Sequence, residues 1–219
     1  MELIYDLALE TITPPLFMLP WIGQNFSKTK VLFLGESEYD DGTEFHKKWK
    51  REWITSQRIT HIKTDSRLLN KIDQTILSNN FSAESQKILW SSVAYTNLVQ
   101  RAMNWQENKI DKPTDEDLIE GWETILKVLL VMKPTMIVKW GILGDGVLRG
   151  FIHNKTFKDW KFETINNNRF LLLKHNSGYS ARILFVHHPS WRFFNANKVS
   201  ETINTKLPEL NLLITQSMN

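Results

Sequence analysis

Short runs of apolar residues, each ended by a polar or glycine-containing turn, punctuate the chain. The continuous apolar run 31–34 predicts a strand that is buried on both faces, and the largely apolar segments 92–99 and 135–138 predict a second and a third strand. Two later runs, 170–173 and 183–186, flank Asn176-Ser177-Gly178 and predict a hairpin. The pattern therefore favours a sheet whose central strands are covered on both sides.

Helical periodicity fills the intervals between these strands. The clearest helix starts after Thr114, because Asp117 three residues later completes a capping box and an apolar stripe with helical spacing follows. Pro134 closes this helix. Further helices are predicted at 43–54, 84–90 and 197–213, the last one interrupted near Pro208. Alternating strands and helices predict the α/β class, here a three-layer α/β/α domain with a mostly parallel central sheet.

No repeat or flexible linker divides the sequence, so a single domain over 1–219 is predicted. Residues 1–30, which contain three prolines, are expected to form an irregular lead-in. Residues 40–90 are expected to form a helical, basic insertion, and 141–146 a strand-to-helix turn.

Composition narrows the class of protein. Apolar residues at 42% and charged residues at 23% are ordinary globular values. Without cysteine the chain can form no disulfide and no thiolate-held zinc or iron–sulfur site, so we expect no cofactor and no metal. No long apolar window and no basic leader occur, which predicts a cytoplasmic protein that does not enter a membrane. We also expect a monomer.

Charge is unevenly distributed, although the formal net charge is only +3. Segments 42–63 and 151–198 are basic, and 111–123 between them is acidic. This distribution indicates a charged face of the kind that binds nucleic acid, with scattered solvated lysines as the alternative.

Polar residues of catalytic type follow three of the predicted strands. Gly35-Glu36-Ser37 follows the first strand, Asn97 ends the second, and His187-His188-Pro189-Ser190 follows the last. In an α/β sheet such strand ends gather at one edge, where ligands bind.

These motifs, in this order, resemble the uracil-DNA glycosylase superfamily, especially the branch whose first motif begins Gly-Glu. Lys112-Pro113-Thr114 and the segment 133–141 fit the same order and spacing, so the resemblance covers about 31–194. The cysteines of the cluster-bearing branch are absent. The resemblance implies a uracil-DNA glycosylase-like fold and an enzyme that flips a nucleotide out of DNA and cuts its N-glycosidic bond.

The resemblance also implies roles for three residues. Glu36 is the carboxylate that faces the sugar and water, and His188 is the catalytic donor to the departing base. Asn97 reads the base edge with its amide. Taken singly, each residue also has a structural interpretation: Glu36 as a turn residue, His188 as a histidine beside proline, and Asn97 as a strand-end amide. His187, the neighbour of His188, is expected to have a structural role.

The first motif departs from the related Gly-Gln-Asp-Pro-Tyr pattern. Ser37 stands where that pattern has the catalytic aspartate, so either Glu36 or Glu38 must carry the charge. Tyr39 matches the tyrosine that screens C5 of the base, and Ser37 and Tyr39 are both assigned to base binding. This part of the pocket is therefore expected to differ from the family pattern.

Contacts to DNA are expected on both sides of these motifs. The run Ser190, Trp191, Arg192, Phe193 lies where the family inserts a wedge into the base stack, although an aromatic run of this kind also suits a core. Basic side chains of the insertion, Lys47, Lys48 and Arg51, are expected to contact phosphates.

Together these features predict a monofunctional DNA glycosylase that acts on a modified cytosine of phage DNA, such as a hypermodified or glucosylated hydroxymethyl cytosine, in antiviral defence. The first alternative is uracil excision in base-excision repair, and the second is a non-catalytic DNA-binding relative. A serine esterase is disfavoured, because Leu184 and Phe185 occupy the positions three before the histidines, where such enzymes need aspartate.

Overall fold

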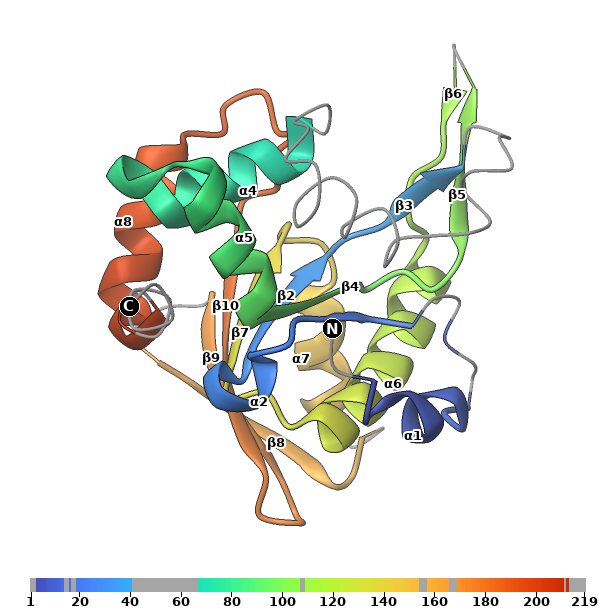
Figure 1. Ribbon diagram of the computed structural model, residues 1–219. Helices are drawn as coiled ribbons and strands as arrows, with labels where there is room; N and C mark the ends of the chain where they lie inside the picture. The colour runs from blue at the N-terminus through green and yellow to red at the C-terminus, as the bar shows by residue number, and fades with distance from the viewer. Residues whose placement is uncertain are drawn as a thin grey trace.

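The computed structural model describes residues 3–13, 16, 19–40, 67–106, 109–153, 157–165, 169–210 and 212. Within them, a seven-stranded mixed sheet has the strand order β1-β4-β2-β7-β10-β9-β8 (Figure 1). Its strands are β1 (Trp21–Ile22), β2 (Val31–Gly35), β4 (Val93–Asn97), β7 (Met136–Trp140), β8 (Trp160–Thr164), β9 (Phe170–His175) and β10 (Ser180–Val186).

The four central strands, β4, β2, β7 and β10, are parallel, as expected for runs that are apolar on both faces. The strands outside them, β1, β9 and β8, pair antiparallel. The predicted hairpin is confirmed: β9 and β10 pair across a turn in which Gly178 has a φ of +87°. That conformation suits glycine, which lacks a Cβ.

Helices cover both faces of the sheet (Figure 1). One face, with Leu32, Ile137 and Phe185, packs against α1, α6 and α7. The other face, with Phe33 and Val138, packs against α4, α5 and α8. The helices are α1 (Asp6–Glu10), α2 (Phe26–Thr29), α4 (Arg67–Leu77), α5 (Ala83–Ser92), α6 (Asp115–Met132), α7 (Asp145–His153) and α8 (Ala196–Lys206), with a 3-10 turn, η3, at Ser78–Asn80. The result is the three-layer α/β/α arrangement that the sequence predicts.

The lead-in is more regular than expected. Helix α1, strand β1 and helix α2 all lie within 1–30, and Leu9, Ile22 and Phe26 are fully buried. The three prolines led us to expect an irregular segment, and the short elements were missed because two to five residues carry too little periodicity to detect. The correction follows from tertiary packing: β1 pairs with β4, and the Phe26 ring meets Tyr5 edge-on.

A second, three-stranded sheet stands beside the main one, at the upper right in Figure 1. It consists of β3 (Glu38–Asp40), β5 (Ala102–Gln106) and β6 (Lys109–Ile110), in the order β3-β5-β6. Of the expected insertion at 40–90, residues 67–80 form α4 and η3, and α5 begins at residue 83. The helix expected at 43–54 lies outside the described residues.

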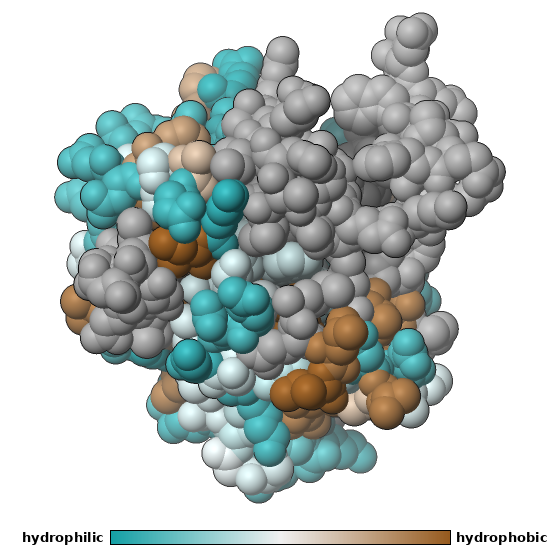
Figure 2. Space-filling model, viewed as in Figure 1, coloured by the Kyte–Doolittle hydropathy of each residue, from teal (hydrophilic) through white to brown (hydrophobic). Residues whose placement is uncertain are grey.

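An apolar area lies at the lower right of Figure 2. Leu3, Ile4 and Leu7, in and just before α1, are exposed apolar side chains. Among the described helices, none combines the length and the apolar character that crossing a bilayer requires.

Candidate active site

Strand order places the candidate site beyond the carboxyl ends of β2 and β7. Across the sheet the parallel strands β4, β2, β7 and β10 follow the chain order second, first, third, fourth. The connection after β2 therefore leads to one side of the sheet, and the connection after β4 returns to the other side. Open α/β sheets of this order bind ligands where the direction changes, between the first and third strands. Glu36 directly follows β2, and Gly141 directly follows β7.

The Glu36 carboxylate packs against Gly141. Gly141 has a φ of +107°, and a Cβ on it would overlap Glu36 Oε2. The same added Cβ would lie 3.4 Å from Lys139 Nζ. Because glycine has no side chain, position 141 leaves room for the Glu36 carboxylate and the Lys139 ammonium beside the same turn.

Lys139 is buried inside strand β7, with none of its surface exposed. Its Nζ donates to the carbonyl oxygens of Trp140 and Gly141, at 3.2 and 3.3 Å. Burial lowers the pKa of Lys139 to about 8, and the nearby Glu36 carboxylate opposes this shift. Burial likewise raises the pKa of Glu36, and the Lys139 ammonium opposes that shift.

His188 has a defined tautomer. Its Nδ1 accepts a hydrogen bond from the Ser190 backbone N–H at 3.2 Å and lies 2.6 Å from Ser190 Oγ. An Nδ1 that accepts leaves the proton of a neutral imidazole on Nε2. Burial first, and then the positive charges of Lys139 and Lys71, lower the pKa of His188 to about 4. At neutral pH the ring is therefore an uncharged donor through Nε2.

One cation links the two expected catalytic residues. The Lys139 ammonium acts on Glu36, at the end of β2, and on His188, beyond the end of β10. Lys71 of α4 supports the His188 loop, since its Nζ donates to the Pro189 carbonyl at 2.7 Å. Sequence reasoning missed Lys139. The available signal was a lysine within an otherwise apolar strand, between Val138 and Trp140.

Asn97 lies at the same sheet edge but is almost fully buried. It is the register partner of Gly35, and its Oδ1 accepts from the Tyr95 hydroxyl at 3.2 Å. A Cβ at position 35 would overlap Asn97 Oδ1. Asn97 is therefore packed against the end of β2, one residue before Glu36.

The remaining base-binding candidates follow Glu36 along the chain. Ser37 is half-buried between β2 and β3. Tyr39 lies in β3, and its backbone pairs with Met103 of β5. Glu38, the alternative carboxylate, begins the same strand. The chain therefore leaves the main sheet directly after Ser37.

Two rings of the aromatic run after Pro189, those of Trp191 and Phe193, lie on the surface. They are therefore not part of the hydrophobic core, which was the alternative interpretation of this run. Trp191 is 43% exposed and Phe193 is 59% exposed. Trp191 stacks on His187 with a centroid separation of 4.2 Å, and the Arg192 guanidinium lies 4.3 Å from the Phe193 centroid. His187 is thus a structural support for Trp191. Lys47, Lys48 and Arg51 lie outside the described residues.

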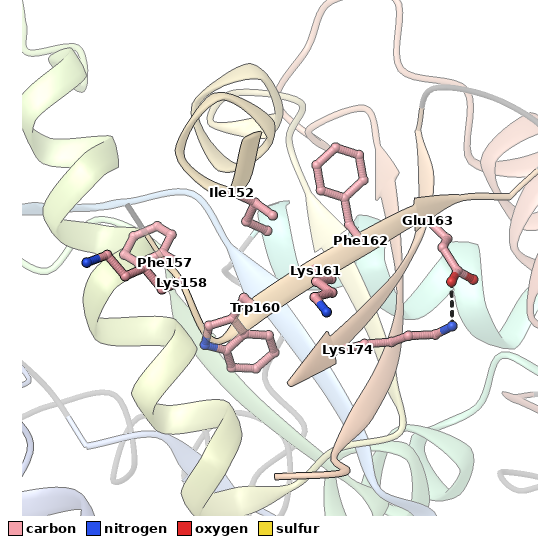
Figure 3. Close-up of a pocket in the computed structure, with 8 residues that line it drawn as sticks. All are labelled: Ile152, Phe157, Lys158, Trp160, Lys161, Phe162, Glu163 and Lys174. Carbon is pink, nitrogen blue, oxygen red and sulfur yellow. Dashed lines mark hydrogen bonds and ion pairs between the residues drawn. The ribbon is translucent and has the colours of Figure 1, made fainter. Parts of the chain in front are cut away.

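A separate hollow of about 690 Å³ lies along β8, away from this edge (Figure 3). Trp160, which lines it, pairs with His175 next to the β9–β10 turn, at the amino ends of the parallel strands. Its lysines include Lys174, which forms an ion pair with Glu163 (Figure 3). This hollow is therefore at the opposite end of the sheet from Glu36 and His188.

Within the described parts of the chain, no cluster of three His, Asp or Glu side chains has the geometry to hold a metal ion. Comparison of the chain with protein-family models and with curated protein sequences finds no match.

Proposed function

We propose that the protein is a DNA glycosylase that hydrolyses the N-glycosidic bond of a flipped nucleotide. The observation that carries this proposal is that Glu36, which follows β2, and His188, which lies beyond the end of β10, lie at the same edge of the sheet, with the buried Lys139 ammonium acting on both. The order of motifs that resembles the uracil-DNA glycosylase superfamily supports the same reaction.

The reaction requires two complementary groups. As the bond from C1′ to the base nitrogen breaks, its electron pair leaves with the base, and the sugar becomes positive. Glu36 stabilises the positive sugar and accepts a proton from the water that attacks C1′. His188 donates a hydrogen bond from Nε2 to the oxygen of the departing base, where the negative charge develops. The products are an abasic sugar and the free base, which takes its proton from solvent.

The neutral state of His188 matters for this role. A histidine with a pKa of about 4 is uncharged at neutral pH and still carries its Nε2 proton. Such a donor stabilises an anionic leaving group without requiring acidic conditions. A non-catalytic DNA-binding relative has no need for this arrangement, so the catalytic proposal is preferred.

We infer that the base is a modified cytosine of phage DNA, with uracil as the alternative. Ser37 replaces the carboxylate of the related motif, and after it the chain turns into β3, which pairs with β5 instead of continuing at the main sheet. This change in the wall beside Glu36 supports a substrate that differs from plain uracil.

Base release decides between these possibilities. The purified protein is incubated with three duplexes that contain uracil, only unmodified bases, or glucosylated hydroxymethyl cytosine, and the released bases are separated and quantified. We expect release from the third duplex only, together with alkali-labile abasic sites. Release from the uracil duplex alone would favour the repair alternative, and binding without release from any duplex would favour the non-catalytic one.

The exposed aromatic run supports the DNA partner. Trp191 and Phe193 present rings to solvent, and Arg192 adds a positive charge between them. If Arg192 contacts a phosphate, Arg192→Ala lowers the slope of log affinity against log salt by about one. An unchanged slope would place the DNA face elsewhere.

A further inference from the structure

Lys139 is an unusual residue for the interior of a sheet. The other side chains of β7 that are buried without exposure are apolar, whereas Lys139 carries an ammonium into the same layer. Burial of a charge is costly unless a counter-charge and hydrogen bonds compensate for it.

The compensation at Lys139 is incomplete. Its Nζ donates to two backbone carbonyls, and the charge that acts on it from the described residues is the carboxylate of Glu36. Neither hydrogen bond is short, at 3.2 and 3.3 Å. The folded protein therefore retains a charge whose burial is only partly offset.

The geometry shows where this charge acts. Glu36 Oε2 and Lys139 Nζ both border the position of the missing Gly141 side chain. The positive charges of Lys139 in β7 and Lys71 in α4 also act on His188, and both lower its pKa. Among the described residues, Lys139 is the cation that acts on both groups.

We propose that Lys139 is a positioning residue whose buried ammonium keeps the Glu36 carboxylate charged and the His188 imidazole neutral. The proposal deepens the proposed function and rests on it. A positive charge attracts a carboxylate and repels an imidazolium, so one ammonium drives the two groups to the opposite protonation states that glycosidic cleavage needs.

Three variants test this role. Lys139→Met removes the charge and keeps a side chain of similar length, Lys139→Arg keeps the charge, and Lys174→Met is a control on the surface at the far end of the sheet. The first readout uses no DNA: the pKa of His188 is measured by NMR titration of the free protein. We expect it to rise above about 4 in Lys139→Met, while burial and the charge of Lys71 still hold it below 6.5, and to stay low in Lys139→Arg and Lys174→Met.

Thermal unfolding and base release complete the test. We expect Lys139→Met to melt at a higher temperature than the wild type, because an incompletely compensated buried charge is gone. We also expect it to release base at least tenfold more slowly at pH 7, with the acid limb of the rate profile moved to higher pH, because Glu36 loses its stabilising charge. A purely structural lysine would give a lower melting temperature and no change in the titration of His188.

The outcomes separate the two proposals. An unchanged His188 titration in Lys139→Met overturns the role of Lys139, whether or not base is released. No base release by the wild type, with His188 shifted as expected, overturns the proposed function alone. Should Lys139→Met not fold, Glu36→Gln replaces it: the pKa of Lys139 should then fall below about 8, and an unchanged value overturns the proposal.

Discussion

Two opposing influences act on the charge of Glu36: burial, which favours the protonated acid, and Lys139, which favours the carboxylate. If the carboxylate faces the sugar, Glu36→Gln should slow single-turnover base release by about a hundredfold or more, because the amide neither stabilises the positive sugar nor accepts a proton from water. DNA binding should be retained. Glu38→Gln is the matched control, and a loss in that variant with no loss in Glu36→Gln would move the catalytic charge to β3.

Variants of His188 and variants of the aromatic run beside it should be defective at different steps of the reaction. His188→Ala should still flip the base but release it about a hundredfold more slowly, because the imidazole is the group that donates to the leaving base. Trp191→Ala, or Phe193→Ala if that more exposed ring is the wedge, should weaken flipping instead.

Fluorescence of 2-aminopurine beside the target reports flipping, and quenched single turnovers report cleavage. The defect of the wedge variant should shrink on a mismatched or single-stranded substrate, where little unstacking energy is needed. Equal loss of both steps in both variants, on every substrate, would contradict this division of roles.

At the scale of elements, helix α6 depends on its first turn. Thr114 Oγ1 accepts from the Asp117 N–H, and the Asp117 carboxylate accepts from the Thr114 N–H. Thr114→Ala should lower the free energy of unfolding by about 1 kcal/mol, because the backbone N–H of Asp117 loses its acceptor. Thr114→Ser, which keeps the hydroxyl, should restore most of it in urea titrations. Equal stabilities for the alanine and serine variants would show that the cap does not matter.

Elements that carry their own local signal were predicted correctly. The capping box and apolar stripe of α6 lie within one segment, and so do the apolar runs of β2 and β7. Strand β1 carries no such signal: two residues become a strand because β4 lies beside them. The second sheet has the same origin, since β3 pairs with β5 more than sixty residues later along the chain.

The candidate site was predictable only where motifs end strands. Glu36, Asn97 and His188 follow that rule, and the sheet brings their strands together. Lys139 could not be assigned, because a single lysine in a sequence is ordinarily a surface residue. Its burial depends on β2 and β10 lying on both sides of β7, which is a property of the sheet and not of the local sequence.

At the scale of the whole molecule, the buried charge should make stability depend on pH. The pKa of Lys139 is about 8 in the folded protein and 10.5 when the chain is unfolded and exposed. Between these values the unfolded state binds more protons, so the free energy of unfolding rises with pH. The stabilising effect is complete above pH 10.5 and is lost as the pH falls through about 8, where the folded protein must bury the ammonium.

Lys139→Met removes this dependence, so the comparison of the two proteins isolates it from the many surface groups that also titrate. The difference in the free energy of unfolding, variant minus wild type, should be about 3 kcal/mol larger at pH 7 than at pH 10.5. Urea unfolding at both pH values measures the difference, with Lys174→Met as the control that should show none. The loss of two hydrogen bonds to carbonyls shifts both measurements equally, so it cannot imitate the effect. A gap of the same size at both pH values would mean that the pKa of Lys139 is the same in the folded and unfolded states, so that its buried charge is fully compensated. A difference well above about 3 kcal/mol would mean that Lys139 is uncharged when buried, and that the cation shared by Glu36 and His188 does not exist at neutral pH.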